Sequence, residues 1–125
     1  MKILVTGAAG FIGAALSQAL CARGDRVIGL DNLNDYYPVS LKRDRLARVA
    51  EAAGEAFRFV ECDFSDEAAL DRALEGESFT AIVHLGAQAG VRYSLENPRA
   101  YARSNLTGHL NILELARERG IGHLV

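Results

Sequence analysis

The sequence of 125 residues contains no tryptophan, one methionine, two prolines and two cysteines. Cys21 and Cys62 lie far apart and show no C-x-x-C spacing. Neither a disulfide framework nor a cysteine metal site is therefore expected, and both residues are interpreted as small reduced side chains of a cytoplasmic protein. The three histidines, His84, His109 and His123, have no metal-ligand spacing either.

Long apolar runs and a strong excess of one charge are also missing. No apolar run approaches membrane-spanning length, and the first residues show no signal-peptide pattern. The formal net charge of −2 gives no reason to expect nucleic acid or an anionic membrane as a partner. The densest basic stretch, Lys42, Arg43, Arg45 and Arg48, alternates with acidic residues, which predicts a solvated helix face.

Short apolar runs alternate with helical patterns along the whole chain. Strands are expected at residues 3–5, 27–31, 56–62 and 79–85, and helices at 11–23, 40–53, between Ser65 as N-cap and Gly76, and from Asn97-Pro98 to Gly120. This alternation favours one α/β domain over residues 1–125 with a doubly wound parallel sheet. Residues 123–125 predict the start of a fifth strand, so we expect a truncated sheet with an unpaired edge on the fourth strand.

Three glycines at three-residue spacing join the first strand to the first helix. In a dinucleotide-binding turn, Gly7 would permit the bend, Gly10 would let a phosphate approach, and Gly13 would let helix and strand pack closely. The helix N-terminus would then direct free N–H groups at a pyrophosphate. Glycine spacing alone also fits an ordinary turn between a strand and a helix, so both interpretations stay open on this motif.

Asp31 ends the second expected strand, where a dinucleotide-binding fold places the carboxylate that holds the adenosine ribose. A 2′-phosphate there would face like charge, on the order of 4 kcal/mol for two unit charges at 4 Å and an effective dielectric of 20. Residues 32–34 contain no Arg or Lys to reverse that effect. NAD is therefore predicted in preference to NADP.

Five segments resemble the extended short-chain dehydrogenase/reductase family, in its branch of NAD-dependent nucleotide-sugar epimerases and dehydratases. They are TGAAGFIG at 6–13, DNLNDYY at 31–37, CDF at 62–64, HLGAQAGVRYS at 84–94 and YARSNLTGHLNILE at 101–114. The resemblance covers the whole chain and is strongest to the UDP-glucuronate 4-epimerases of that branch. It implies a Rossmann-type domain, NAD as cofactor, a UDP-sugar substrate and a homodimer.

Carried over by position, the resemblance implies a set of cofactor contacts. They are, for the pyrophosphate, Gly7, Gly10, Phe11, Ile12 and Gly13; for the adenosine ribose, Asp31 and Asn32; for the adenine, Asp63 and Phe64; for the nicotinamide-side ribose, Leu85, Gly86, Ala87 and Ala89; and for the nicotinamide half of the pocket, Asn105.

Several of these positions have a second interpretation. Asp63 could instead cap the turn that follows it, and Asn105 could be an exposed polar residue. Gly86 stands where the family usually has Ala and is expected to add flexibility and do little else. His84 is interpreted as a hydrogen-bonded strand-end residue. Arg92 is either an ordinary loop residue or, in our hypothesis, a contact for a sugar carboxylate or diphosphate, since it follows a strand on the ligand-binding side of the sheet.

The family's proton chemistry needs a Tyr-x-x-x-Lys pair, and none of the four tyrosines here has a lysine four residues later. No catalytic residue is assigned, and these 125 residues are expected to bind NAD without turnover. The alternatives are a nucleotide-sugar dehydratase of the same family and a non-catalytic NAD-binding module. The implied dimer would use the long helix after Pro98, whose leucines are expected to be exposed and to limit solubility.

Overall fold

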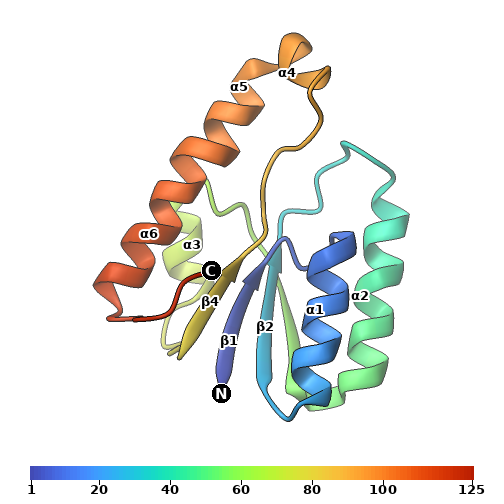
Figure 1. Ribbon diagram of the computed structural model, residues 1–125, viewed down its shortest axis with the longest axis vertical. Helices are drawn as coiled ribbons and strands as arrows, with labels where there is room; N and C mark the ends of the chain where they lie inside the picture. Colours follow the sequence, from blue (N-terminus) through green and yellow to red (C-terminus); the bar gives the residue numbers. More distant parts are fainter.

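One parallel sheet forms the centre of the molecule, with helices on both of its faces (Figure 1). The computed structural model describes all 125 residues. Its strands are β1 (Lys2–Thr6), β2 (Arg26–Asp31), β3 (Phe57–Glu61) and β4 (Ala81–His84). They lie in the order β3-β2-β1-β4, and every pairing is parallel. The predicted α/β class with a doubly wound parallel sheet is confirmed.

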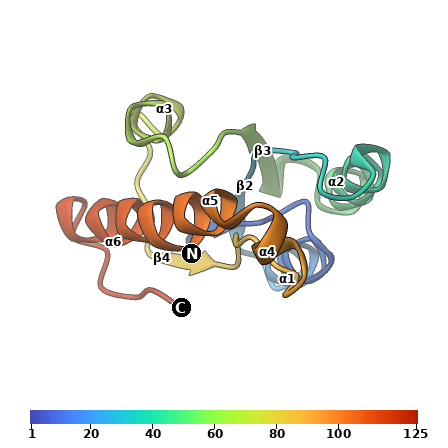
Figure 2. The same ribbon diagram turned by 90° about the horizontal axis from the view of Figure 1, so that it is seen from above.

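The helical segments connect these strands and extend beyond them. They are α1 (Phe11–Ala22), α2 (Val39–Ala53), η1 (Gly54–Ala56), α3 (Glu67–Ala73), α4 (Tyr93–Glu96), α5 (Pro98–Tyr101), η2 (Ala102–Gly108) and α6 (His109–Glu118). Helices α1 and α2 cover one face of the sheet, and α3 and α6 cover the other, as Figure 1 and Figure 2 show. None of the helices has the length and apolarity needed to cross a membrane.

Each strand contributes to two cores because successive side chains of a strand point to opposite faces. Ile3 and Val5 pack in the cluster beneath α1 and α2, together with Val49. Leu4, between them in the sequence, packs on the other face with Ile112 of α6. None of these five residues is more than 3% exposed, so the central strands are apolar on both sides, as parallel strands between two helical layers require.

The glycine-rich turn is held tightly against the first helix. Gly7 has a φ of 68°, which favours glycine. A Cβ on Gly13 would overlap the carbonyl oxygen of Gly7. The close packing of helix on strand that the sequence predicts at Gly13 is therefore present.

The predicted unpaired edge on the fourth strand is wrong in part. Residues 123–125 lie parallel to β4, with a bridge between Ile82 and Leu124. The amide of Ile82 donates to the carbonyl of His123 at 2.9 Å, and the amide of His84 donates to that of Val125 at 2.8 Å. The last three residues thus satisfy edge groups of β4, as the first residues of a fifth strand would.

The long helix after Pro98 is interrupted, which its apolar spacing did not predict. Asn97 caps it as predicted, its side chain accepting from the amide of Ala100 at 3.3 Å. Between α5 and α6, however, residues 102–108 (η2) form a π-helix. Wider π turns of this kind often occur at functional sites. The short helix α4, which precedes α5, was not among the predicted elements.

The N-cap of α3 is Asp66, one residue after the predicted Ser65. The Asp66 side chain accepts from the amide of Ala69 at 3.0 Å. Ser65 donates its hydroxyl to Asp63 instead. Serine and aspartate are both good N-caps. Because the Ser65 hydroxyl is bound to Asp63, Asp66 caps the helix instead.

Candidate functional site

A cavity lies at the carboxyl ends of β1, β2 and β4, where the chain changes direction across the sheet. The connections from β1 to β2 and from β2 to β3 run one way, and β4 lies on the other side of β1. Such a switch point is where open α/β sheets bind their ligands. The cavity is lined by Gly7, Gly10, Asp31, Asn32, Asn34, Tyr36, Tyr37, Lys42, Phe64, Leu85, Gly86, Ala87, Gln88, Ala89 and Ser104.

The N-terminus of α1 opens at this cavity without a side-chain cap. Gly10 is the N-cap, no side chain accepts from the first turn, and that turn holds no acidic residue. The first amides of a helix have no partner within it, so they are available to an anion, which the helix dipole also attracts. Phe11 and Ile12 are exposed at this end, whereas Gly13 is buried beneath the turn.

Asp31 is buried at the end of β2, and its carboxylate is held by backbone amides. Oδ1 accepts from the amide of Leu33 at 2.9 Å, and Oδ2 accepts from that of Ala9 at 3.2 Å. The side chain is therefore fixed at the bottom of the cavity, in the place that the sequence predicts for a ribose-binding carboxylate.

Lys42 is a lining residue that the sequence analysis missed. Its ammonium lies 3.7 Å from Oδ1 of Asp31 and donates to Oδ1 of Asn34 at 2.9 Å. Its side chain is only 6% exposed. A signal was available, because Lys42 shares the buried face of α2 with Leu46 and Val49 at helical spacing.

The predicted solvated face on α2 is therefore wrong for two of its four basic residues. Besides the buried Lys42, Arg45 is half-buried and donates to the Tyr37 hydroxyl at 2.9 Å. Its guanidinium also lies 5.8 Å from the centre of the Phe11 ring. Only Arg43 and Arg48 are exposed. Lys42 faces the cavity and Arg45 faces the glycine-rich turn. The alternation of basic and acidic residues in the sequence does not reveal this difference.

Asn105 holds the loop after β4 against the long helix. Its Oδ1 accepts from the amide of Gln88 at 2.8 Å, and its Nδ2 donates to the Gln88 carbonyl at 3.0 Å. The Tyr101 hydroxyl lies within hydrogen-bonding distance of the carbonyl oxygens of Ala89 and Gly90. Asn105 is thus exposed, as its second interpretation expects, and does not line the cavity, but its side chain is bound to Gln88 and positions the residues that do.

Gly86 makes room for an aromatic ring, a packing role that the expectation of added flexibility did not include. A Cβ on Gly86 would overlap one edge of the Phe64 ring, and a Cβ on Gly108 would overlap the other edge. The ring therefore fits between the loop after β4 and the π-helix. The Phe64 ring also packs edge to face against the imidazole of His84, with 5.1 Å between the two ring centres.

His84 is hydrogen-bonded at the end of its strand, as the sequence analysis interpreted it. Its Nδ1 lies 2.6 Å from the hydroxyl of Thr6, which accepts from the amide of Gly86 at 3.0 Å. Burial lowers the pKa of His84 to about 4, with a smaller contribution from the neighbouring His109. The imidazole is therefore neutral at pH 7, and it shares one hydrogen bond with the Thr6 hydroxyl.

Asp63 and Arg92 lie away from this cavity. Asp63 lines a second, adjoining hollow, and its Oδ1 accepts from the amide of Ser65 at 2.9 Å, so it caps the turn that follows it and also forms part of the wall of that hollow. Arg92 is exposed just before α4 and lines neither hollow. No group of three or more His, Cys, Asp or Glu side chains is placed to hold a metal ion.

Comparisons with known proteins agree on one family. The sequence profile of the NAD dependent epimerase/dehydratase family matches residues 3–125. UDP-glucuronate 4-epimerase 3 of Arabidopsis thaliana is 52% identical over 116 residues, which cover 93% of this chain and 26% of that protein.

Solved structures of two enzymes share the fold at higher coverage. UDP-glucose 4-epimerase of Thermus thermophilus, in complex with NAD, superposes with a TM-score of 0.80 at 35% identity, over 99% of this chain and 36% of that one. The dTDP-glucose 4,6-dehydratase DesIV of Streptomyces venezuelae, with NAD bound, superposes with a TM-score of 0.81 at 35% identity, over 99% and 38%. The chain spans 26% to 38% of the length of these three proteins.

Proposed function

The chain belongs to the NAD-dependent epimerase/dehydratase family, and from that premise we propose that residues 1–125 form the NAD-binding domain of a UDP-glucuronate 4-epimerase. The observation that carries the proposal is the 52% identity with an enzyme of that name over 93% of the chain. When bound, NAD would supply the hydride-transfer chemistry that inverts the configuration at C4 of the sugar.

The residues at the first turn fit the pyrophosphate of NAD. Gly7 and Gly10 line the cavity, and the amides of the first turn of α1, which no side chain caps, would donate to an anion bound there. In this proposal the backbone at Phe11 and Ile12 donates to the phosphates, and Gly13 acts indirectly by holding the helix against the turn.

The residues at the end of β2 fit the adenosine ribose. Asp31 accepts from the ribose hydroxyls with a carboxylate already oriented by two backbone amides. Asn32 lies beside it on the cavity wall. Lys42 supplies the positive charge that balances Asp31 inside the protein and limits the desolvation cost of that carboxylate.

The loop after β4 borders the nicotinamide side. Leu85, Gly86, Ala87 and Ala89 line this part of the cavity, and Asn105 holds them in place through Gln88. The contribution of these residues is to orient the cofactor and exclude water. They carry no group suited to proton transfer, in keeping with the absence of a tyrosine followed four residues later by lysine.

Arg92 is proposed as a substrate contact. It follows β4 on the ligand-binding side of the sheet, and it is an exposed cation without a hydrogen bond from its side chain. A UDP-sugar acid offers it a diphosphate and a carboxylate, the two groups that a guanidinium binds best.

A sugar-nucleotide dehydratase is the second candidate. It is supported by the superposition on the dTDP-glucose 4,6-dehydratase of Streptomyces venezuelae, which is as good as that on the epimerase of Thermus thermophilus. Both reactions begin with oxidation at C4, so the cofactor half of the site does not separate them.

A homodimer and a cytoplasmic location complete the proposal. Leu106, Leu110 and Leu113 are 71%, 56% and 42% exposed on the long helix, an apolar stripe that a second copy of the helix would cover. Both cysteines are free thiols, and burial raises the pKa of each, which suits a reducing compartment.

The test is a product analysis on protein expressed from the complete reading frame. With UDP-glucuronate as substrate, we expect its C4 epimer and no net change in NADH absorbance, because the hydride is returned. Formation of a 4-keto-6-deoxy sugar from a nucleotide hexose, without any epimer, would select the dehydratase and contradict the proposal.

A further inference from the structure

The cofactor cavity continues into a second hollow at the end of β3. The two share Asn32, Asn34 and Ser104 among their lining residues. With the pyrophosphate at the end of β1 and the ribose at the end of β2, the base of the nucleoside lies at the next strand in the sheet, β3. Asp63 follows that strand and lines this hollow.

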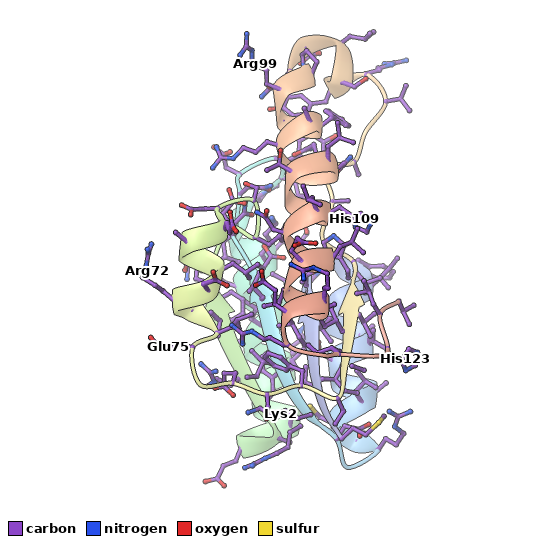
Figure 3. All side chains as sticks on the ribbon, turned by 90° about the vertical axis from the view of Figure 1, so that its left-hand side faces the viewer. Lys2, Arg72, Glu75, Arg99, His109 and His123 are labelled. Carbon is purple, nitrogen blue, oxygen red and sulfur yellow. The ribbon has the colours of Figure 1, made fainter.

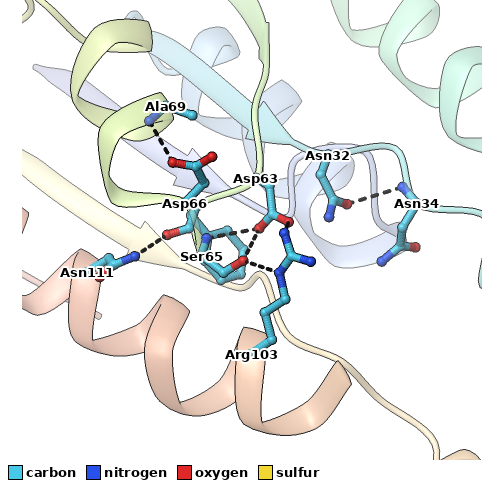
Figure 4. A network of polar contacts seen from close by, with 9 residues as sticks. Asn32, Asn34, Asp63, Ser65, Asp66, Ala69, Arg103 and Asn111 are labelled. Atoms are coloured by element: carbon cyan, nitrogen blue, oxygen red, sulfur yellow. Dashed lines mark hydrogen bonds and ion pairs between the residues drawn. The ribbon is translucent and has the colours of Figure 1, made fainter. Parts of the chain in front are cut away.

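Asp63 belongs to a closed ring of polar contacts with Ser65 and Arg103 (Figure 4). Its Oδ1 accepts from the Ser65 hydroxyl at 2.6 Å as well as from the Ser65 amide at 2.9 Å. Its Oδ2 accepts from Nη2 of Arg103 at 3.1 Å. Nε of Arg103 donates to the Ser65 hydroxyl at 2.9 Å and closes the ring.

The ring leaves Asp63 with one vacant acceptor position. An ionised carboxylate has about four lone-pair sites, two on each oxygen. The amide and the hydroxyl of Ser65 fill both sites of Oδ1, and Arg103 fills one site of Oδ2. The second site of Oδ2 remains, and the bonds from Ser65 and Arg103 together fix the carboxylate plane in which it lies.

Arg103 reaches this carboxylate because the π-helix comes unusually close to the loop after β3. Gly108 is buried, and a Cβ there would overlap the Phe64 ring. Asn111, three residues further on, donates to the Phe64 carbonyl at 3.0 Å. The two contacts hold residues 63–65 and the helix together, so the position of Arg103 is set by packing and not by the ion pair alone.

We propose that Arg103 and Ser65 are positioning residues that make Asp63 selective for a 6-aminopurine at the far end of the cofactor cleft. The vacant site of Oδ2 accepts a hydrogen bond from the exocyclic amine of adenine. A 6-oxopurine presents a carbonyl oxygen there, which repels a carboxylate that can neither rotate nor donate. The inference rests on the proposed NAD site and adds the residues that determine which base it takes.

The experiment measures dissociation constants for NAD and for nicotinamide hypoxanthine dinucleotide, which differ only at position 6 of the purine. Calorimetric titrations are made on the unmodified chain and on Arg103→Met, Ser65→Ala and Arg99→Met. Arg99 is the matched control, since it projects from α5 one turn earlier (Figure 3), lines the same hollow and makes no contact with Asp63.

We expect the unmodified chain to prefer NAD by about tenfold, the size of one hydrogen bond to a charged group. In Arg103→Met and Ser65→Ala that ratio should fall to about two- or threefold, while Arg99→Met keeps it. The ratio is internal to each variant, so a general loss of stability or affinity, which weakens both ligands alike, leaves it unchanged. Arg103→Lys keeps the charge but replaces the two guanidinium nitrogens that bind Ser65 and Asp63 by a single ammonium nitrogen, and it should give an intermediate ratio.

Two results overturn the inference and leave the proposed function standing. One is equal binding of the two dinucleotides by the unmodified chain, and the other is an undiminished preference for NAD in both Arg103→Met and Ser65→Ala. Failure of the unmodified chain to bind either dinucleotide contradicts the proposed function itself, and the inference falls with it.

Discussion

At the scale of single residues, the main feature of the site is the buried ion pair of Asp31 and Lys42. Asp31 could be predicted from its place after an apolar strand, because that position has a fixed role in dinucleotide-binding folds. Its partner Lys42 could not be assigned in the same way, since a lysine among other charged residues indicates a surface. The pairing depends on how α2 lies over β2, which is tertiary information.

The pair makes a prediction about the choice between NAD and NADP. Asp31→Asn removes the like charge that a 2′-phosphate would meet and leaves the Lys42 ammonium in place. We expect the affinity for NADP relative to NAD to rise about tenfold, as measured by titration with each dinucleotide. The double variant Asp31→Asn, Lys42→Met is the control and should lose that gain; retention of the gain would show that Lys42 has no part in it.

His84 makes a prediction about stability and pH. Burial lowers its pKa from 6.5 to about 4, so between these values the unfolded chain binds a proton that the folded chain does not. Above pH 6.5 the imidazole is neutral in both states and costs the folded chain nothing. As the pH falls from 6.5 towards 4, protonation favours the unfolded chain, and the free energy of unfolding decreases. After allowance for partial exposure, we expect a loss of about 1–2 kcal/mol in the free energy of unfolding.

Urea unfolding at about pH 7, 5.5 and 4.5 measures this loss. In His84→Asn, the side-chain amide can still form a hydrogen bond with the Thr6 hydroxyl, but the side chain does not titrate. The loss over this pH range should therefore be smaller in the variant by the amount assigned to His84. Equal losses in the two proteins would assign the effect to other groups.

At the scale of elements, most strands and helices could be predicted because their apolar spacing and caps agree with the sheet around them. The exceptions are local. The π-helix at residues 102–108 has no sequence signature of its own, since the pattern of apolar residues does not report the extra width of its turns. The cap of α3 moved from Ser65 to Asp66 because Asp63 competes for the serine.

The π-helix makes a prediction about the loop after β4. In Asn105→Ala, the amide and carbonyl of Gln88 lose both partners, so the loop should open more often and NAD should bind about tenfold more weakly. Hydrogen exchange resolved at residues 86–90 measures the opening. Asn111→Ala, which frees the carbonyl of Phe64 instead, should leave exchange at Gln88 unchanged, and an unchanged Gln88 in Asn105→Ala would refute the role of Asn105.

At the scale of the whole molecule, the sequence predicts the sheet and the two helical layers that cover it. It does not predict how the edge of β4 is covered. Strand and helix alternation fixes a parallel sheet with helices on both faces. Whether residues 123–125 pair with β4 depends on the turn at Gly120, which has a φ of 64° and returns the chain to the sheet edge. The exposed leucines of the long helix were expected from the dimer that the family resemblance implies, and they are present.

These leucines make a prediction about association. Leu106, Leu110 and Leu113 form one exposed stripe, so the chain should self-associate with rising concentration in sedimentation experiments, and Leu110→Glu should shift it towards the monomer. Leu95→Glu is the control, because Leu95 is 86% exposed on α4, outside the stripe. An unmodified chain that stays monomeric at every concentration would contradict the proposed helix-mediated dimer.

The most direct test of the central claim is a calorimetric titration of the 125-residue chain with NAD, after circular dichroism has shown that the chain is folded. We predict one NAD bound per chain, with weaker binding of NADP because of the buried carboxylate of Asp31. A folded chain that binds no NAD would contradict the assignment of the cleft at the carboxyl ends of β1, β2 and β4.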